Sequence, residues 1–364
     1  MTSWVSLIAA VACSLITTGC EPETAAGGGT DRPPHHTDGT YRNPPGSPER
    51  GGSFWEWIAF SGRRALGGPP QGVPDDHVIP EDEAAARLAE LDRRDSVTWI
   101  GHAAVLLRLA GKTILTDPYL SDWASPAPPF GPKRLVPPGI SITNLPQIDM
   151  ILVSHNHYDS LDVRTLKALA HRDRIAVVAP LGLEPVLREA GVRDVQELDW
   201  HEKVVKDGVT ITAVPVIHWS KRTLFDRNAT LWAGFVIAAD GRKILFVGDS
   251  GYHPTLFKEI GARYGPFDLA ILPIGGYAPR HLMRAGHVTP EEAVQIGKDS
   301  SSRTLLAIHW GTVVLTDEPP FEPPHRFRRA AREAGYADHN VWVFQIGESR
   351  ALGGPAGKAG AGVH

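Results

Sequence analysis

From about position 96 onward, short apolar runs alternate with amphipathic stretches in one continuous pattern. The apolar runs are rich in Val, Ile and Leu and are bounded by turn-forming residues, which is typical of buried strands. The first three runs follow one another closely and predict a meander. The predicted strands are Val97–Ile100, Val105–Leu109, Thr113–Leu115, Ile151–Val153, Ile175–Ala179, Val209–Val214, Trp232–Ala238, Lys243–Val247, Leu269–Leu272, Leu305–Ile308 and Val341–Phe344.

Helical periodicity separates several of these strands. The predicted helices are Val163–His171, Leu183–Ala190, Thr255–Tyr264 and Pro290–Lys298. The last one begins with a capping box, with Thr289 as the N-cap and Glu292 at the third helical position. Many strands with helices interspersed predict an α/β domain over residues 96–350, in which two sheets carry helices on their outer faces. Residues 351–364 are expected to form a disordered tail.

The first 19 residues resemble an export signal. The apolar run Trp4–Ile16 is shorter than the roughly 20 residues that span a bilayer. Small residues then precede Cys20, as in a bacterial lipobox, although no Lys or Arg precedes the run and Thr17 replaces the usual aliphatic residue. We expect an exported lipoprotein that is anchored through lipidated Cys20 and faces the periplasm or the cell exterior. A plain cleaved signal and a misread start are the alternatives.

Two segments separate this signal from the domain. Residues 20–50 are polar and rich in Gly and Pro, which predicts a flexible tether in which His35 and His36 are solvated rather than bound to metal. Residues 51–95 form an aromatic and Pro-rich segment with a cluster at Phe54, Trp55, Trp57, Ile58 and Phe60. We expect this cluster to dock on the domain, in preference to a contact with a membrane interface.

Charge and cysteine content exclude several functions. The formal net charge is −4 and no block of Lys and Arg occurs, so nucleic acid is not expected as a partner. The two cysteines are Cys13 and Cys20, so the rest of the chain has no disulfide, thiolate nucleophile or thiolate metal ligand. The sequence does not fix the oligomeric state.

The strongest chemical signal directly follows the apolar strand Ile151–Val153. There His155, His157 and Asp159 alternate within one short loop. Imidazole and carboxylate are the ligands that Zn²⁺ takes when thiolate is not available. Three further candidates, His218, Asp249 and His309, each follow a predicted strand. Packing alone does not explain why four strand ends should all supply His or Asp.

This order of His-x-His-x-Asp, His, Asp and His is that of the metallo-β-lactamase superfamily. The flanking residues resemble one branch, the N-acylphosphatidylethanolamine-hydrolysing phospholipase D family and its bacterial relatives, over roughly residues 95–348. The matching stretches are Val97–His102, Leu115–Pro118, Ser154–Asp162, His218–Arg222, Gly248–Tyr252, His287–Ala293 and His309–Thr312. The resemblance implies an αββα sandwich with two mixed β-sheets and a zinc-dependent hydrolase.

The resemblance also implies the ligand set. His155, His157 and His218 would hold one zinc ion, Asp159 and His309 a second, and Asp249 would bridge them. The family usually places a histidine directly after the aspartate, where this chain has Ser160, a poor zinc ligand. The second site is therefore expected to be weaker, more open, or completed by water or a residue such as His253.

The implied reaction is attack by a hydroxide, formed from water between the two cations, on a phosphodiester. Asp249 would orient that water, and His287 would donate a proton or bind the phosphate, unless it is only a helix-capping surface residue. His102 is expected to be a buried residue that supports a ligand rather than a catalytic one. Asp117 is expected to be a structural turn residue, with support of a metal ligand as an additional role.

The expected substrate is N-acylphosphatidylethanolamine or a related phospholipid, met at the membrane through the lipid anchor. Lys221 and Arg222 either attract its anionic head group or belong to a solvated loop. Two alternatives stay open: a hydrolase of the same fold acting on a lactone, a sugar phosphate or another small ester, and a non-catalytic lipid-binding lipoprotein.

Overall fold

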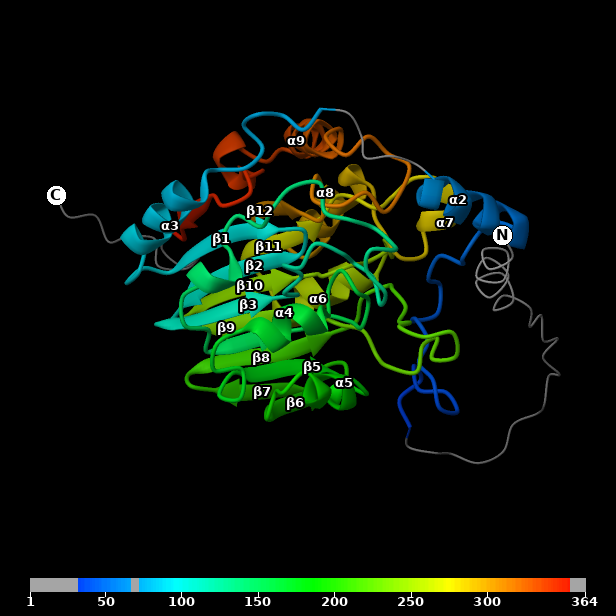
Figure 1. Ribbon diagram of the computed structural model, residues 1–364, viewed down its shortest axis with the longest axis horizontal. Coiled ribbons are helices and arrows are strands. Elements are labelled where there is room, and N and C mark those ends of the chain that lie inside the picture. The colour runs from blue at the N-terminus through cyan, green and yellow to red at the C-terminus, as the bar shows by residue number, and fades with distance from the viewer. Residues whose placement is uncertain (1–31, 67–71, 354–364) are drawn as a thin grey trace.

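The computed structural model describes residues 32–66 and 72–353, and these form two seven-stranded sheets with helices on their outer faces (Figure 1). The first sheet has the order β14-β1-β2-β3-β4-β5-β6 and the second has the order β13-β12-β11-β10-β9-β8-β7. In each sheet one half is antiparallel and the other half parallel. The α/β sandwich of two mixed sheets predicted from the sequence is therefore confirmed.

The strands lie close to the predicted apolar runs. Those of the first sheet are β1 (Ser96–Gly101), β2 (Ala104–Leu109), β3 (Lys112–Thr116), β4 (Met150–Leu152), β5 (Ala176–Pro180), β6 (Asp194–Leu198) and β14 (Ser349–Ala351). Those of the second are β7 (Lys203–Lys206), β8 (Val209–Val214), β9 (Gly234–Ala239), β10 (Arg242–Phe246), β11 (Phe267–Pro273), β12 (Ser302–Ile308) and β13 (Val341–Trp342). The polar edge strands β6, β7 and β14 were not predicted, and β14 extends the domain to Ala351.

Eight α-helices occur in the described residues: α2 (Phe54–Leu66), α3 (Glu81–Glu90), α4 (Val163–Ala168), α5 (Glu184–Glu189), α6 (Leu256–Tyr264), α7 (Arg280–Met283), α8 (Pro290–Asp299) and α9 (Pro323–Glu333). Two short 3-10 turns, η2 (Ile142–Asn144) and η3 (Asp338–Asn340), complete the list. The predicted capping box of α8 is present, with Thr289 and Glu292 bonded reciprocally. Within the described ranges, no helix is both long and apolar enough to cross a membrane.

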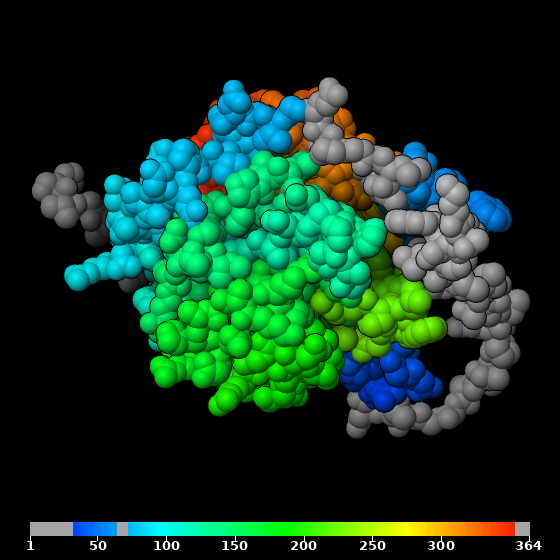
Figure 2. All heavy atoms as spheres, in the orientation of Figure 1, coloured from blue at the N-terminus to red at the C-terminus, as the bar shows by residue number. Residues whose placement is uncertain are grey.

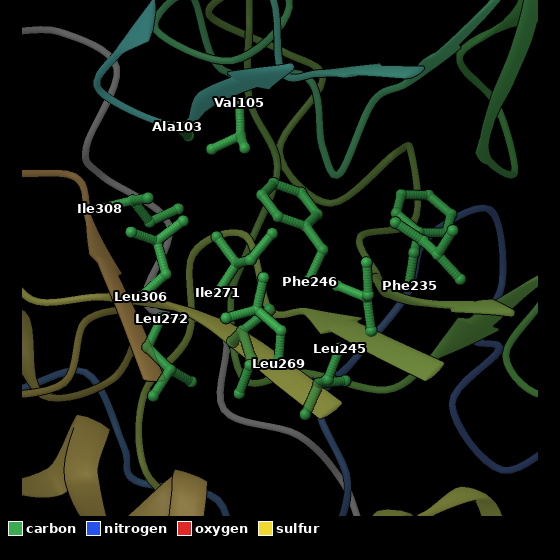
Figure 3. Packing of buried hydrophobic residues seen from close by; sticks show 14 of the residues in the cluster. Ala103, Val105, Phe235, Leu245, Phe246, Leu269, Ile271, Leu272, Leu306 and Ile308 are labelled. Carbon is green, nitrogen blue, oxygen red and sulfur yellow. The ribbon is translucent and has the colours of Figure 1, made fainter. Parts of the chain in front are cut away.

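The main core lies between the two sheets. Trp99 and Val105 of the first sheet and Phe235, Phe246 and Ile271 of the second belong to one buried cluster. Figure 3 shows Val105 pointing from β2 toward Phe246 and Ile271. A second cluster fills the outer face of the first sheet, where α3, α4 and α5 contribute Leu88, Leu166 and Leu187. Because strands such as β1 and β2 are buried on both faces, they read as continuous apolar runs.

Residues 32–50, which we call the N-terminal strap, differ from the expected flexible tether. The strap packs against the segment that joins β8 to β9, where Tyr41 N donates to Asn228 O at 2.9 Å. His35 and His36 are not solvated, because their Nε2 atoms lie 2.6 and 2.7 Å from the two carboxylate oxygens of Asp199. Figure 2 shows the strap as the blue patch at the lower right. Cys13, Cys20 and the proposed signal lie outside the described residues.

The aromatic cluster at 54–60 divides between the domain and the solvent. Trp57 and Phe60 of α2 pack against Leu282 and Met283 of α7. Trp55 on the same helix is 73% exposed. The docking expected of this segment therefore involves one face of α2 only.

Candidate metal centre

The predicted ligands follow the carboxyl ends of four strands, and these ends meet at one edge of the sandwich. His155 follows β4 of the first sheet, while His218, Asp249 and His309 follow β8, β10 and β12 of the second. All four side chains are buried, with 1–3% exposure. The fold thus brings residues that are far apart in the sequence into one cluster that contains side chains from both sheets.

Three histidines form the first half of the cluster. His157 Nδ1 lies 2.8 Å from His155 Nε2 and 3.1 Å from His218 Nε2. A zinc ion with bonds of about 2.0–2.1 Å to each nitrogen would hold them slightly further apart, at about 3.3 Å. Burial lowers the pKa of His155 and His218 and lowers the pKa of His157 to about 3. The three rings are therefore neutral at pH 7, which is the form that binds metal.

A hydrogen-bonded relay orients His155. Ser154 Oγ donates to Asp117 Oδ2 at 2.6 Å, so it accepts from His155 Nδ1 at 2.8 Å. That arrangement leaves the lone pair of His155 Nε2 free for a cation. The relay needs a glycine at Gly248, where φ is +63° and a Cβ would lie 2.7 Å from the Ser154 Cβ. Asp117 therefore supports a ligand as well as forming a turn.

The second half of the cluster contains Asp159 and His309. His309 Nε2 lies 3.8 Å from Asp159 Oδ2, and these two groups cluster with His102 within the reach of one ion. Burial alone would lower the pKa of His309, but Asp249 and Asp159 outweigh it and raise this pKa to about 9. A cation would take the place of that proton.

Asp249 lies between the two halves. Its Oδ2 is 3.8 and 3.9 Å from the Nε2 atoms of His155 and His218, and its Oδ1 is 3.1 Å from His309 Nε2. One carboxylate oxygen thus faces each half, which is the geometry that a bridging ligand requires. Burial would raise the pKa of Asp249, but the neighbouring histidines, His309 above all, hold it well below its usual range.

The donor set fits a metal pair because it contains buried polar atoms that the described residues leave without a hydrogen bond. These are His102 Nδ1, His157 Nε2, Ser160 Oγ, Asp249 Oδ1, His287 Nδ1 and both ring nitrogens of His309. Buried polar groups are almost always paired, so a concentration of unpaired ones in one place indicates a missing ligand. Neutral imidazoles and carboxylates are suitable ligands for zinc.

His287 lies at the mouth of this cluster. Its ring is 5.4 Å from the ring of His218 and 5.5 Å from that of His309. Gly276 permits this approach, since a Cβ there would lie 2.7 Å from His287 Nδ1. The N-cap of α8 is Thr289, so capping does not explain His287. His287 is partly buried, and its ring lies beside two of the predicted ligands.

Two other sequence expectations change. His253 does not approach the second half of the cluster, because its Nε2 lies 3.1 Å from Pro45 O and its Nδ1 accepts from Leu256 N at 3.2 Å. Arg222 is a structural residue, whose guanidinium donates to the carbonyl oxygens of Asn156 and Leu161. Lys221 is half-buried, and burial followed by the nearby Arg227 and Arg50 lowers its pKa.

A cavity of about 350 Å³ opens beside His218 and His287. Trp57, Phe60, Leu282 and Met283 give it an apolar wall, and Arg50 and Arg227 line it as well. Both guanidiniums lie over Trp219, at 6.0 and 4.8 Å from the ring centroid. Within the described ranges, no carboxylate pairs with either arginine. Burial, followed by the nearby Arg227, lowers the pKa of Arg50 to about 10.

The sequence reasoning missed Arg50 and Arg227, because an isolated arginine in a loop carries no spacing signal. In the structure they give the cavity two cationic groups, and the aromatic and aliphatic wall gives it an apolar side. The cavity is therefore suited to an amphipathic anion.

Comparisons with known proteins agree with this geometry. A family model described as a beta-lactamase superfamily domain matches residues 112–310. An uncharacterized protein of Mycobacterium tuberculosis is 39% identical over 284 residues, which cover 76% of this chain and 72% of that protein. N-acyl-phosphatidylethanolamine-hydrolyzing phospholipase D 1 of Caenorhabditis elegans is 40% identical over 242 residues, covering 64% of this chain and 68% of the relative.

The fold itself recurs in solved structures. The isothiocyanate hydrolase from Delia radicum gut bacteria has a TM-score of 0.57 and 21% identity, over 70% of this chain and 98% of that chain. A possible metal-dependent hydrolase from Veillonella parvula has a TM-score of 0.55 and 17% identity, over 71% of this chain and 100% of that chain. At this level of identity the likeness concerns the fold alone.

Proposed function

Since this chain belongs to the beta-lactamase superfamily domain family, we propose that it is a zinc-dependent hydrolase of the phospholipase D type that cleaves N-acylphosphatidylethanolamine or a related phospholipid. The observation that carries the proposal is a His and Asp cluster with unpaired nitrogens beside a cavity that combines apolar walls with two arginines. Similarity to the Caenorhabditis elegans relative supports the substrate class.

The cluster assigns a role to each group. Two zinc ions would supply hydroxide from water near neutral pH and stabilise the attacking and leaving oxygens. His155, His157 and His218 would hold one ion, Asp159 and His309 the other, and Asp249 would contact both. The water oxygen adds to phosphorus, the bond from phosphorus to the ethanolamine oxygen breaks, and that oxygen takes up a proton. The products are a phosphatidic acid and an N-acylethanolamine.

The residues around the cavity position the substrate. Arg50 and Arg227 attract the anionic phosphodiester, and the wall formed by Trp57, Phe60 and Leu282 takes up acyl chain. His287 lines the same cavity as the arginines, and its ring lies 5.4 Å from the ring of His218. It is therefore placed to protonate the leaving alcohol oxygen or to bind a phosphoryl oxygen.

The first test is turnover. Purified, zinc-loaded protein is incubated with N-acylphosphatidylethanolamine, and both products are followed by mass spectrometry. We expect Asp249→Ala to lose metal and at least about 1,000-fold in kcat/KM, because it removes the group shared by both ions. Asp173→Ala on the exposed surface is the matched control. Activity and metal retained by Asp249→Ala would refute the mechanism, and an inactive zinc-loaded wild type would redirect the search to another ester.

We also propose that the protein is an exported lipoprotein held at a bacterial membrane through Cys20. The small residues before Cys20 support this proposal, and an anchored enzyme meets lipid substrate at high local concentration. In cells fed a labelled fatty acid, Cys20→Ala should abolish labelling of the protein, whereas Cys13→Ala should retain it. Labelling that survives Cys20→Ala would contradict the anchor.

A further inference from the structure

The second half of the metal cluster lacks the histidine that usually follows the motif's aspartate. Ser160 occupies that position, is fully buried, and its Oγ has no hydrogen-bond partner among the described residues. With Asp159, His309 and the shared Asp249 alone, a zinc ion there would have only three protein ligands. Nothing on the Ser160 side chain can supply a strong fourth ligand.

We propose that His102 supplies this missing ligand. Its Nε2 lies 3.0 Å from Asp159 Oδ2, and its ring lies 4.0 Å from the ring of His309. Ligand atoms on one tetrahedral zinc ion are about 3–3.4 Å apart, so the first distance suits two ligands of the same ion. His102, Asp159 and His309 can converge on one ion as His155, His157 and His218 can.

The turn that carries His102 is held rigidly in place. It joins β1 to β2, and the backbone of His102 has a φ of +55°, which is uncommon for a residue other than glycine. His102 N donates to Thr312 Oγ1 at 2.8 Å, and its carbonyl oxygen accepts from Trp99 Nε1 at 2.9 Å. Unusual backbone conformations held by several hydrogen bonds are characteristic of functional positions.

A direct backbone bond also couples the two histidines. His309 N donates to His102 O at 3.0 Å, and His309 has a φ of +63°. The two rings are thus presented together by the turn after β1 and the end of β12. The pair joins the first sheet to the second sheet at the metal cluster.

The ring of His102 does not behave like that of an ordinary buried histidine. It is 1% exposed, its only ring hydrogen bond among the described residues is to Asp159, and its Nδ1 has no partner there. Zinc on Nε2 would leave Nδ1 as it is, so the case for ligation rests on the position of Nε2 beside Asp159 and on the approach of the ring to His309. The competing role, a hydrogen bond that merely orients Asp159, has to be separated from ligation by experiment.

The inference rests on the proposed two-metal centre, so the first measurement is zinc per wild-type chain by plasma mass spectrometry, with affinities from chelator competition. Two zinc ions are expected. One or none would refute the two-metal part of the proposed function and this inference with it. If the wild type binds two ions, the variants of His102 test ligation by His102 separately from the two-metal proposal.

His102→Gln is the decisive variant, because glutamine retains an N–H donor for Asp159 but is a poor zinc ligand. We expect one tightly bound zinc, with the second bound about 100-fold more weakly or lost. The matched control is His171→Ala, an exposed histidine at a φ of +54°, which should keep two. If His102→Gln binds two zinc ions with unchanged affinity, His102 is a positioning residue and the proposal fails.

A rescue variant protects the test against misfolding. In the His102→Gln background, Ser160→His restores the family's usual ligand, and the second zinc should return. Circular dichroism and the melting temperature show whether each variant is folded. A folded double variant that still binds one zinc would mean that His102 acts on the second site through the fold rather than as a ligand.

Discussion

At the residue scale, the tautomer of His155 depends on a carboxylate that does not contact the metal cluster. Asp117 is buried, and burial raises its pKa to about 7 even though Ser154 donates two hydrogen bonds to it. When it is ionised, Asp117 has no proton to donate and can only accept a hydrogen bond from Ser154 Oγ. The hydroxyl of Ser154 therefore has to accept its second hydrogen bond from His155 Nδ1. An amide at position 117 could instead donate to the hydroxyl and reverse the relay.

We therefore expect Asp117→Asn to weaken zinc binding at the first site by about 10–100-fold, as loss of a residue that orients a ligand usually does. The reversed relay would place the proton of His155 on Nε2, where it blocks coordination, as Asp→Asn does in serine proteases. Chelator competition measures the affinity, and Asp173→Asn on the exposed surface is the control. An unchanged affinity in a folded variant would show that the relay does not set the tautomer.

The sequence identified some residues of the metal cluster but not the contacts of others. His155, His157 and Asp159 could be recognised because they alternate within one loop. The structure places His155 and His157 in one group of candidate ligands and Asp159 in another. The resemblance placed His102 near the site as a support for a ligand, but its contact with His309 depends on how the turn after β1 packs against the other sheet. His253 was equally plausible by residue type, and only the fold shows that it faces the strap.

At the element scale, the N-terminal strap is the largest departure from expectation. Its composition predicts a tether because it buries little apolar surface, yet polar contacts hold it. Asn43 is the contact that matters for the site, since its side chain donates to His218 O at 2.9 Å and accepts from His218 N at 3.1 Å. The helix α9 and the edge strands were missed for a related reason, since charged residues obscure their apolar positions.

The strap should loosen in acid. Burial lowers the pKa of His35 in spite of its bond to Asp199, and the histidine hydrogen bonds outweigh burial and lower the pKa of Asp199. His35 and Asp199 both bind more protons when the strap is released from the domain. Attachment of the strap is therefore complete above pH 6.5 and is lost as the pH falls. Each unit by which the pKa of His35 is lowered changes the attachment equilibrium by up to about tenfold.

Hydrogen exchange of residues 32–43 measures this loosening. After correction for the intrinsic rate, exchange there should be faster at pH 5 than at pH 7.5, while β11 (Phe267–Pro273) stays protected. His35→Gln, which cannot be protonated, should flatten the pH dependence. Exchange of the strap that slows or stays constant toward pH 5 would contradict the assignment.

At the scale of the whole molecule, the alternation of apolar runs and helices was enough to predict the sandwich, because strands buried on both faces leave continuous apolar signals. That pattern did not predict which distant segments of the chain contact one another. β14, near the end of the chain, pairs with β1, and Arg242 of the second sheet bonds to Asp95 beside the first. Such contacts between distant segments depend on the assembled core.

The metal cluster lies where the two sheets meet, so bound zinc should stabilise the molecule as a whole. His155, His157 and Asp159 follow β4 of the first sheet, whereas His218, Asp249 and His309 follow strands of the second. An ion held by both groups resists separation of the sheets. Because the ion binds only to the folded state, it adds about 4 kcal/mol to the free energy of unfolding when free metal is 1,000 times the dissociation constant.

Removal of zinc with a chelator should lower the melting temperature by about 5–15 °C. Asp249→Ala, which lacks the shared carboxylate, should melt at nearly the same temperature with and without zinc. A wild-type melting temperature that does not respond to the chelator would mean that the two halves of the cluster are not joined by metal.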